Sequence, residues 1–295
     1  MQYDFTDNIT SNSAKGSAIF GVFTNKKLNG LNKALSASQK NKISEIIEKS
    51  SFEGKLKEFL CIYDVPGTQF EKLYIIGLGE KDEYGEKKFL KVANNTAILC
   101  KKENLKNTCI DLNSLLNNKI KINWATRNLS ILLCGIDYEY SATKNKTKNK
   151  KIYEINKLTI LSKNKGSLKN LKKSFQQGEA IANGIKLAKN LGNLPSNICT
   201  PTYLAKTASD LSKKNKKLNV KIHNEKEMKS MGMHCLLSVG SGSEEPSKLI
   251  TIKYNGASKS DKPIVLVGKG ITFDTGGISI KPSNAMDEMK YDMCG

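Results

Sequence analysis

The residues best suited to chemistry gather near the end of the chain. Residues 267–295 read VGKGITFDTGGISIKPSNAMDEMKYDMCG and place lysines and carboxylates within a glycine-rich stretch. The segment PIVLVG (263–268), which overlaps its start, is typical of a buried strand, and open α/β sheets place ligands at the carboxyl ends of their strands. Carboxylates concentrated there indicate a hard or borderline divalent cation. On this pattern alone, a surface loop of mixed charge fits equally well.

Two nucleotide-binding motifs that also use glycines are excluded by their spacing. Gly268 and Gly270 could begin a dinucleotide fingerprint, but Phe273 stands where its third glycine belongs. No GKS or GKT follows at the spacing that a phosphate-binding P-loop requires. Metal binding therefore remains as the functional interpretation of this segment.

The same segment resembles the first metal-binding segment of the leucyl (cytosol) aminopeptidases, the M17 family of metallopeptidases. The resemblance extends to NLPSNICTPTYLA (193–205) and MGMHCLLSVGSGSEEPSKLITIKYNG (231–256), which are similar to the opening of that family's catalytic domain. In the first half, KLYIIGLGEKDEY resembles part of the family's macro-like N-terminal domain more weakly. The resemblance thus covers almost the whole chain and grows stronger toward its C-terminal end.

The resemblance implies roles for individual residues. Lys269, Asp274 and Asp292 fall on metal ligands, and Asp274 would bridge two divalent cations, Mn²⁺ or Zn²⁺. Lys269 can ligate only as a neutral amine, so the cations must remove its proton. Lys281 falls on a catalytic lysine that stays protonated and donates to the scissile carbonyl oxygen. Met289 falls on the substrate side-chain pocket, although a core methionine explains that residue equally well.

The activity implied is removal of N-terminal amino acids, preferentially leucine, from peptides by a water that two metal ions activate. The resemblance also implies a cytoplasmic homohexamer. Family members continue to a segment NTDAEGR, which supplies further acidic ligands and a catalytic arginine, and DAEGR does not occur in these 295 residues. We therefore expect the chain as given to stop within its active site and to be inactive alone. We also expect the strand around Val265–Val267 to be left uncovered, so that the chain aggregates or folds only through its N-terminal half.

Other conspicuous residues receive no catalytic role. Asp287 and Glu288 are expected to cap or flank the helix that follows them. His223 and His234 lie outside the motif and are interpreted as structural. Nothing in the sequence near Cys294 would activate it as a nucleophile.

The net charge of +20 raises an alternative function, a non-catalytic binding protein for nucleic acid on a degenerate peptidase scaffold. Arg127 is the only arginine, and the lysine-rich runs 143–151 and 212–217 contain no aromatic residue for base stacking. Nucleic acid is therefore the less favoured partner. The seven cysteines form no CxxC pair, which favours a reducing cytoplasmic location. The apolar runs are too short to cross a membrane.

Alternating strand and helix patterns predict an α/β fold. We expect a macro-like α/β domain over residues 1–165 and a connecting helix over 166–193. The first part of an α/β/α metallopeptidase domain with a largely parallel or mixed sheet would occupy 194–295. The expected strands are 17–23, 72–79, 157–162, 219–224, 248–256 and 262–270. The expected helices are 36–50, 86–102, 171–193, 200–214 and 225–233.

Overall fold

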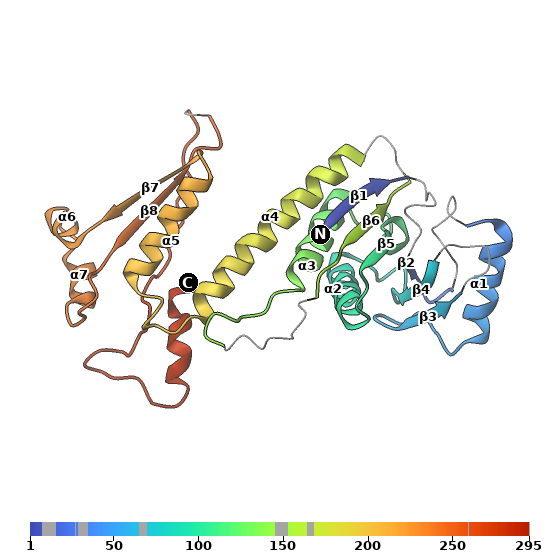
Figure 1. Ribbon diagram of the computed structural model, residues 1–295, viewed down its shortest axis with the longest axis horizontal. Helices are drawn as coiled ribbons and strands as arrows, with labels where there is room; N and C mark the ends of the chain where they lie inside the picture. The colour runs from blue at the N-terminus through green and yellow to red at the C-terminus, as the bar shows by residue number, and fades with distance from the viewer. Residues whose placement is uncertain are drawn as a thin grey trace. The chain divides into compact units, whose positions relative to one another are not determined.

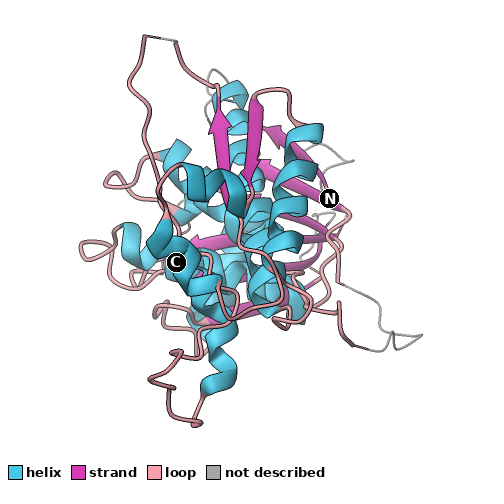
Figure 2. Ribbon diagram, turned by 90° about the vertical axis from the view of Figure 1, so that its left-hand side faces the viewer, coloured by secondary structure: helices cyan, strands magenta, loops and turns pink. Residues whose placement is uncertain are grey.

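The computed structural model describes residues 1–7, 16–26, 28, 35–64, 70–144, 153–163, 168–258 and 260–294. The chain forms two compact units, one of Met1–Glu139 with Thr147–Lys186 and one of Tyr140–Lys146 with Leu187–Gly295. Helices and strands alternate in both units, which confirms the predicted α/β class (Figures 1 and 2). The boundary between the units falls inside helix α4, Leu168–Asn193.

The first unit is built on a mixed sheet of six described strands in the order β1-β6-β5-β2-β4-β3. Neighbouring strands are parallel, except that the edge strand β3 pairs antiparallel with β4. The strands expected at 17–23, 72–79 and 157–162 are found as β2, β4 and β6. The bounds are β1 Gln2–Thr6, β2 Gly16–Val22, β3 Phe59–Tyr63, β4 Phe70–Gly77, β5 Asn107–Asp111 and β6 Lys157–Leu161.

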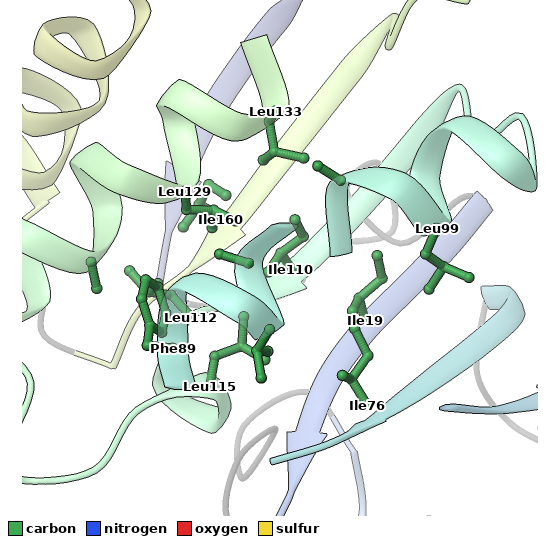
Figure 3. Packing of buried hydrophobic residues seen from close by; sticks show 14 of the residues in the cluster. Ile19, Ile76, Phe89, Leu99, Ile110, Leu112, Leu115, Leu129, Leu133 and Ile160 are labelled. Atoms are coloured by element: carbon green, nitrogen blue, oxygen red, sulfur yellow. The ribbon is translucent and has the colours of Figure 1, made fainter. Parts of the chain in front are cut away.

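Helices cover both faces of this sheet, as a largely parallel sheet requires. Successive side chains of β2 point to opposite faces, so Ile19 belongs to one buried cluster and Phe20 to the other. Helix α1 (Ala37–Lys49) packs into the Phe20 cluster, while α2 (Glu86–Lys102) and α3 (Ile122–Gly135) pack into the Ile19 cluster. Figure 3 shows the Ile19 cluster, with Phe89 of α2 and Leu129 of α3 facing the sheet.

Helix starts follow the local sequence. The amide of Gln39 donates to Ser36 Oγ (3.3 Å) and the Ser36 amide donates to Gln39 Oε1 (2.8 Å), which forms a capping box at the start of α1. At the start of α5 (Pro201–Lys214), Thr200 Oγ1 accepts from the amide of Tyr203 at 3.2 Å. These caps explain why the helices expected at 36–50 and 200–214 begin where they do.

The second unit contains α5, three shorter helices and a two-stranded antiparallel sheet of β7 and β8 among its described residues. The helix expected at 225–233 is present as α6, and the strands expected at 219–224 and 248–256 are present as β7 and β8. The bounds are β7 Leu218–His223, α6 Glu225–Ser230, α7 His234–Gly240, β8 Leu249–Tyr254 and the 3₁₀ helix η3 Met286–Cys294.

The prediction of a strand over 262–270 is wrong. No regular element is formed there, and the side chains of Ile264 and Leu266 are 91% and 92% exposed. A strand exists through its ladder of hydrogen bonds to a neighbour, and no described strand pairs with this segment. An apolar run such as this one is typical of a strand buried inside a sheet. Among the described residues, no element covers it. Within those residues, none of the helices combines the length and apolar character needed to cross a bilayer.

Candidate metal centre

Four of the residues singled out in the sequence lie together in the second unit. Lys269 Nζ is 3.0 Å from Asp274 Oδ2, and Lys281 Nζ is 3.1 Å from the same oxygen. The Lys269 ammonium also forms an ion pair with Asp292 Oδ2. The structure thus brings two lysines and two aspartates from separated positions into one charged cluster.

A glycine turn directs Asp274 and Lys281 toward each other. The amide of Gly276 donates to Asp274 Oδ1 at 2.9 Å, and the amide of Lys281 donates to the Thr275 carbonyl at 2.8 Å. Gly276 has a φ of +90°, and a Cβ added there would lie 2.4 Å from the Ser279 carbonyl oxygen. Only glycine fits that backbone without strain. The DTGG sequence therefore builds the turn that places both side chains in the cluster.

Asp292 enters the cluster from η3. Its Oδ2 atom is shielded from solvent and forms the ion pair with the Lys269 ammonium. Shielding a carboxylate oxygen from water costs free energy unless a positive group compensates for it. The position of Asp292 is therefore suited to a cation, whether an ammonium group or a metal ion.

Each charged group of the cluster favours the charged form of its oppositely charged neighbours. Asp292, and then Asp274, raise the pKa of the Lys269 ammonium through direct hydrogen bonding. The hydrogen bond from Lys269, followed by those from the Gly276 amide and Lys281, holds the pKa of the Asp274 carboxyl well below its usual range. Asp274 is consequently a carboxylate at neutral pH, ready to bind a cation. Lys269 would have to lose its proton before its nitrogen could act as a ligand.

The donor set fits divalent metal binding in part. Carboxylate oxygens are ligands that Mn²⁺ and Zn²⁺ accept, and Asp274 Oδ2 already lies between two positive groups. Among the described residues, no group of three or more His, Cys, Asp and Glu side chains is placed to hold a metal ion. The cluster instead offers two carboxylates and the Lys269 nitrogen. These three donors can contribute to a metal centre but are fewer than two ions need.

Met289 contacts the lysine that was predicted to be catalytic. Lys281 Nζ donates to Met289 Sδ at 3.1 Å, and the methionine is half-buried rather than part of a core cluster. Asp287 and Glu288 are exposed and lie inside the first turn of η3, rather than before the helix as expected. His223 ends β7 and His234 begins α7.

The sequence did not indicate that Asn193 and Tyr291 contribute to this region. The Tyr291 hydroxyl donates to Asn193 Oδ1 at 3.1 Å, a contact between positions 98 apart in the chain. The one available signal was that Tyr291 directly precedes Asp292. Nothing in a single sequence pairs that tyrosine with the end of a helix so distant along the chain.

Both parts of the chain match models of one protein family. The model of the cytosol aminopeptidase family catalytic domain matches residues 186–295, and the model of the N-terminal domain of that family matches residues 19–147. The probable cytosol aminopeptidase of Dechloromonas aromatica (strain RCB) is 38% identical over 295 residues, which cover 100% of this chain and 59% of that protein. The probable cytosol aminopeptidase of Blochmanniella floridana is 36% identical over 301 residues, with 100% and 59% covered.

Two solved structures share the fold. A mutant of tomato leucine aminopeptidase superposes with a TM-score of 0.72 at 19% identity, covering 94% of this chain and 55% of that one. The bottromycin maturation enzyme BotP in complex with Mn superposes with a TM-score of 0.69 at 21% identity, covering 96% and 53%. The fold shared with both structures is an α/β fold. The chain belongs to the cytosol aminopeptidase (M17) family, and it spans 59% of the length of the two curated relatives described above.

Proposed function

We propose that this chain supplies the N-terminal domain and part of the metal centre of an aminopeptidase. The enzyme would remove N-terminal amino acids, preferentially leucine, from peptides. The observation that carries the proposal is the convergence of Lys269, Asp274 and Asp292 on one site, with Lys281 beside them. The family match supports the same reaction class.

In this proposal Lys269, Asp274 and Asp292 would hold divalent cations, Mn²⁺ or Zn²⁺. When bound, such ions supply positive charge that acidifies water and polarises a carbonyl group. The solved structure of BotP, which shares the fold, is a complex with Mn. Asp274 is the residue best placed to face two cations, because its Oδ2 atom already accepts from two ammonium groups.

Lys281 would act on the substrate through its ammonium group. It would donate a hydrogen bond to the scissile carbonyl oxygen as negative charge develops there, an interaction that strengthens in the transition state. Its contact with Met289 Sδ places this donor next to a half-buried apolar side chain. We propose that Met289 lines the pocket for the first side chain of the substrate. The carbonyl group of that first substrate residue would then lie within reach of Lys281.

The activity is proposed for the whole protein. The three candidate ligands in these 295 residues are fewer than two ions need, so we expect no turnover from the chain alone. The whole protein would work in the cytosol as a homohexamer. We further propose the division into a macro-like domain (1–165), a connecting helix (166–193) and the opening of the catalytic domain (194–295).

A chimera tests this function directly. Residues 1–295 are joined to the segment of the Dechloromonas aromatica relative that follows its matched region, and leucine amide hydrolysis is measured with Mn²⁺. We expect turnover by the chimera and none by the 295-residue chain. The Lys281→Ala chimera should keep its metal and lose roughly 10²–10³-fold in kcat, the usual effect of deleting one oxyanion donor.

Two outcomes contradict the proposal. One is a folded, metal-loaded chimera without peptidase activity. The other is a Lys281→Ala chimera as active as its parent, which would assign the hydrogen-bond donor for the carbonyl oxygen to a different residue.

A further inference from the structure

The helix η3, which carries Asp292, is not held in place by burial of its own side chains. None of its nine residues is buried, and it is a 3₁₀ helix, a conformation that rarely persists beyond three or four residues. Poor hydrogen-bond geometry and exposed side chains leave such a segment little stability of its own. Contacts from outside η3 must therefore fix the direction in which Asp292 points.

Those contacts come from the residues that flank Asp292. On one side, the Tyr291 hydroxyl donates to Asn193 Oδ1 in the last turn of α4 at 3.1 Å. On the other side, Cys199 Sγ donates to Met293 Sδ at 3.6 Å. The partners are well fixed, because Cys199 is 2% exposed and its amide donates to the Pro195 carbonyl at 2.9 Å.

Gly192 lets η3 approach α4 closely. A Cβ at this position would lie 3.0 Å from Cys294 Sγ and 3.4 Å from Cδ1 of Tyr291. The 3.4 Å distance is an ordinary contact, but the 3.0 Å distance is tighter than ordinary contact, so an added Cβ would require Cys294, or η3 with it, to move by a few tenths of an ångström. Gly184 lies in the same helix, and a Cβ there would meet nothing within 4 Å. The close approach is thus specific to the turn of α4 that faces the residues around Asp292.

We propose that Gly192 and Tyr291 are positioning residues, which hold η3 against the end of α4 so that the Asp292 carboxylate faces Lys269. Metal ligands must be held to within about 0.5 Å of their working geometry by such supporting contacts. The consequence for metal binding rests on the proposed function, whereas the consequence for the Asp292–Lys269 ion pair does not.

The test uses the 295-residue chain and two pairs of variants. Gly192→Ala is compared with Gly184→Ala, since both add a methyl group to α4 and only the first meets η3. Tyr291→Phe is compared with Tyr203→Phe, a change at an exposed tyrosine of α5. Two quantities are measured: the nitrogen-15 resonance of the Lys269 ammonium group in metal-free protein, and the Kd for Mn²⁺.

We expect Gly192→Ala and Tyr291→Phe to shift or abolish the Lys269 ammonium resonance, because the ion pair that slows its proton exchange is disturbed. They should also weaken Mn²⁺ binding by about 10-fold, the loss typical when an outer-shell partner of a metal ligand is removed. Gly184→Ala and Tyr203→Phe should change neither quantity.

The proposal would be overturned if the Lys269 ammonium resonance were unchanged in both Gly192→Ala and Tyr291→Phe. It would also be overturned if either variant and its control changed the resonance equally. Failure of the proposed function is distinguishable from this. It would show as parent protein that binds no Mn²⁺, and the resonance would still decide whether Gly192 and Tyr291 position Asp292. Tyr291→Phe keeps the ring and removes one hydroxyl, so it remains informative should Gly192→Ala unfold.

Discussion

Lys269 and Lys281 bind the same oxygen atom, with their Nζ atoms 3.0 and 3.1 Å from Asp274 Oδ2. The two lysines carry the same charge and lie at nearly the same distance from this oxygen. They differ in their other partners, because Lys269 also pairs with Asp292 whereas Lys281 also donates to Met289 Sδ. We interpret the first as a metal ligand and the second as a donor to the substrate.

The two lysines should differ when each is replaced. Lys269→Ala deletes a ligand, so it should weaken Mn²⁺ binding by at least the roughly 10-fold that loss of an outer-shell partner costs. Lys281→Ala should leave the metal content unchanged and lower kcat in the chimeric enzyme. Elemental analysis after dialysis measures the metal content, and each variant is the control for the other. Equal metal loss in both would show that the two roles are wrongly assigned.

The uncovered apolar segment should cause self-association. Ile264 and Leu266 are 91% and 92% exposed, and neighbouring exposed apolar side chains attract other apolar surfaces. The double substitution Ile264→Ser and Leu266→Ser should reduce association in sedimentation velocity. It should change the free energy of unfolding by no more than about 0.5 kcal/mol, because so little surface is buried. Lys262→Ser, in the same segment, is the control. A large loss of stability without reduced association would contradict this account.

Alkaline pH should destabilise the first unit through Cys100. Its thiol is fully buried, and burial raises the pKa of Cys100 to about 12, above its ordinary value of 9.0. The folded state therefore retains a proton that the unfolded state loses from about pH 9 upward, so this contribution to stability is present below pH 9 and lost as pH rises.

The slope of the free energy of unfolding against pH reports the number of protons released on unfolding. Between pH 9 and 11, this number should be lower by about one in Cys100→Ala than in the parent. Denaturant unfolding at several pH values measures the slope, and Cys235→Ala, at an exposed thiol, should leave it unchanged. The neighbouring Tyr153, whose own pKa burial raises, is present in both variants. Identical slopes in parent and Cys100→Ala would be inconsistent with a buried, protonated thiol.

Periodic patterns predicted much of the fold. The helical pattern over 36–50 predicted α1, and the apolar runs predicted β2, β4 and β6. The short strands β3 and β5 were not predicted, because five residues without clear alternation carry little signal. The segment 262–270 was predicted as a strand and is not one, since strand formation depends on a partner that local sequence does not report.

Less of the candidate site than of the fold could be predicted from the local sequence. Residue types and spacing indicated a metal site or a mixed-charge loop, and the family resemblance supplied the individual roles. The structure adds that Lys269, Asp274, Lys281 and Asp292 converge. The hydrogen bond from Tyr291 to Asn193 and the close approach of η3 at Gly192 depend on tertiary packing between distant segments, so sequence spacing could not reveal them. The functional roles themselves stay predictions.

The central claim is that Asp274 is a metal ligand, and a titration of Mn²⁺ into the 295-residue chain tests it most directly. The parent should bind Mn²⁺, and Asp274→Asn should weaken binding by at least about 10-fold, because it removes the charge and keeps the shape. Asp287→Asn, at an exposed carboxylate in the first turn of η3, should bind as the parent does. Equal Mn²⁺ affinity in the parent and Asp274→Asn would contradict the account.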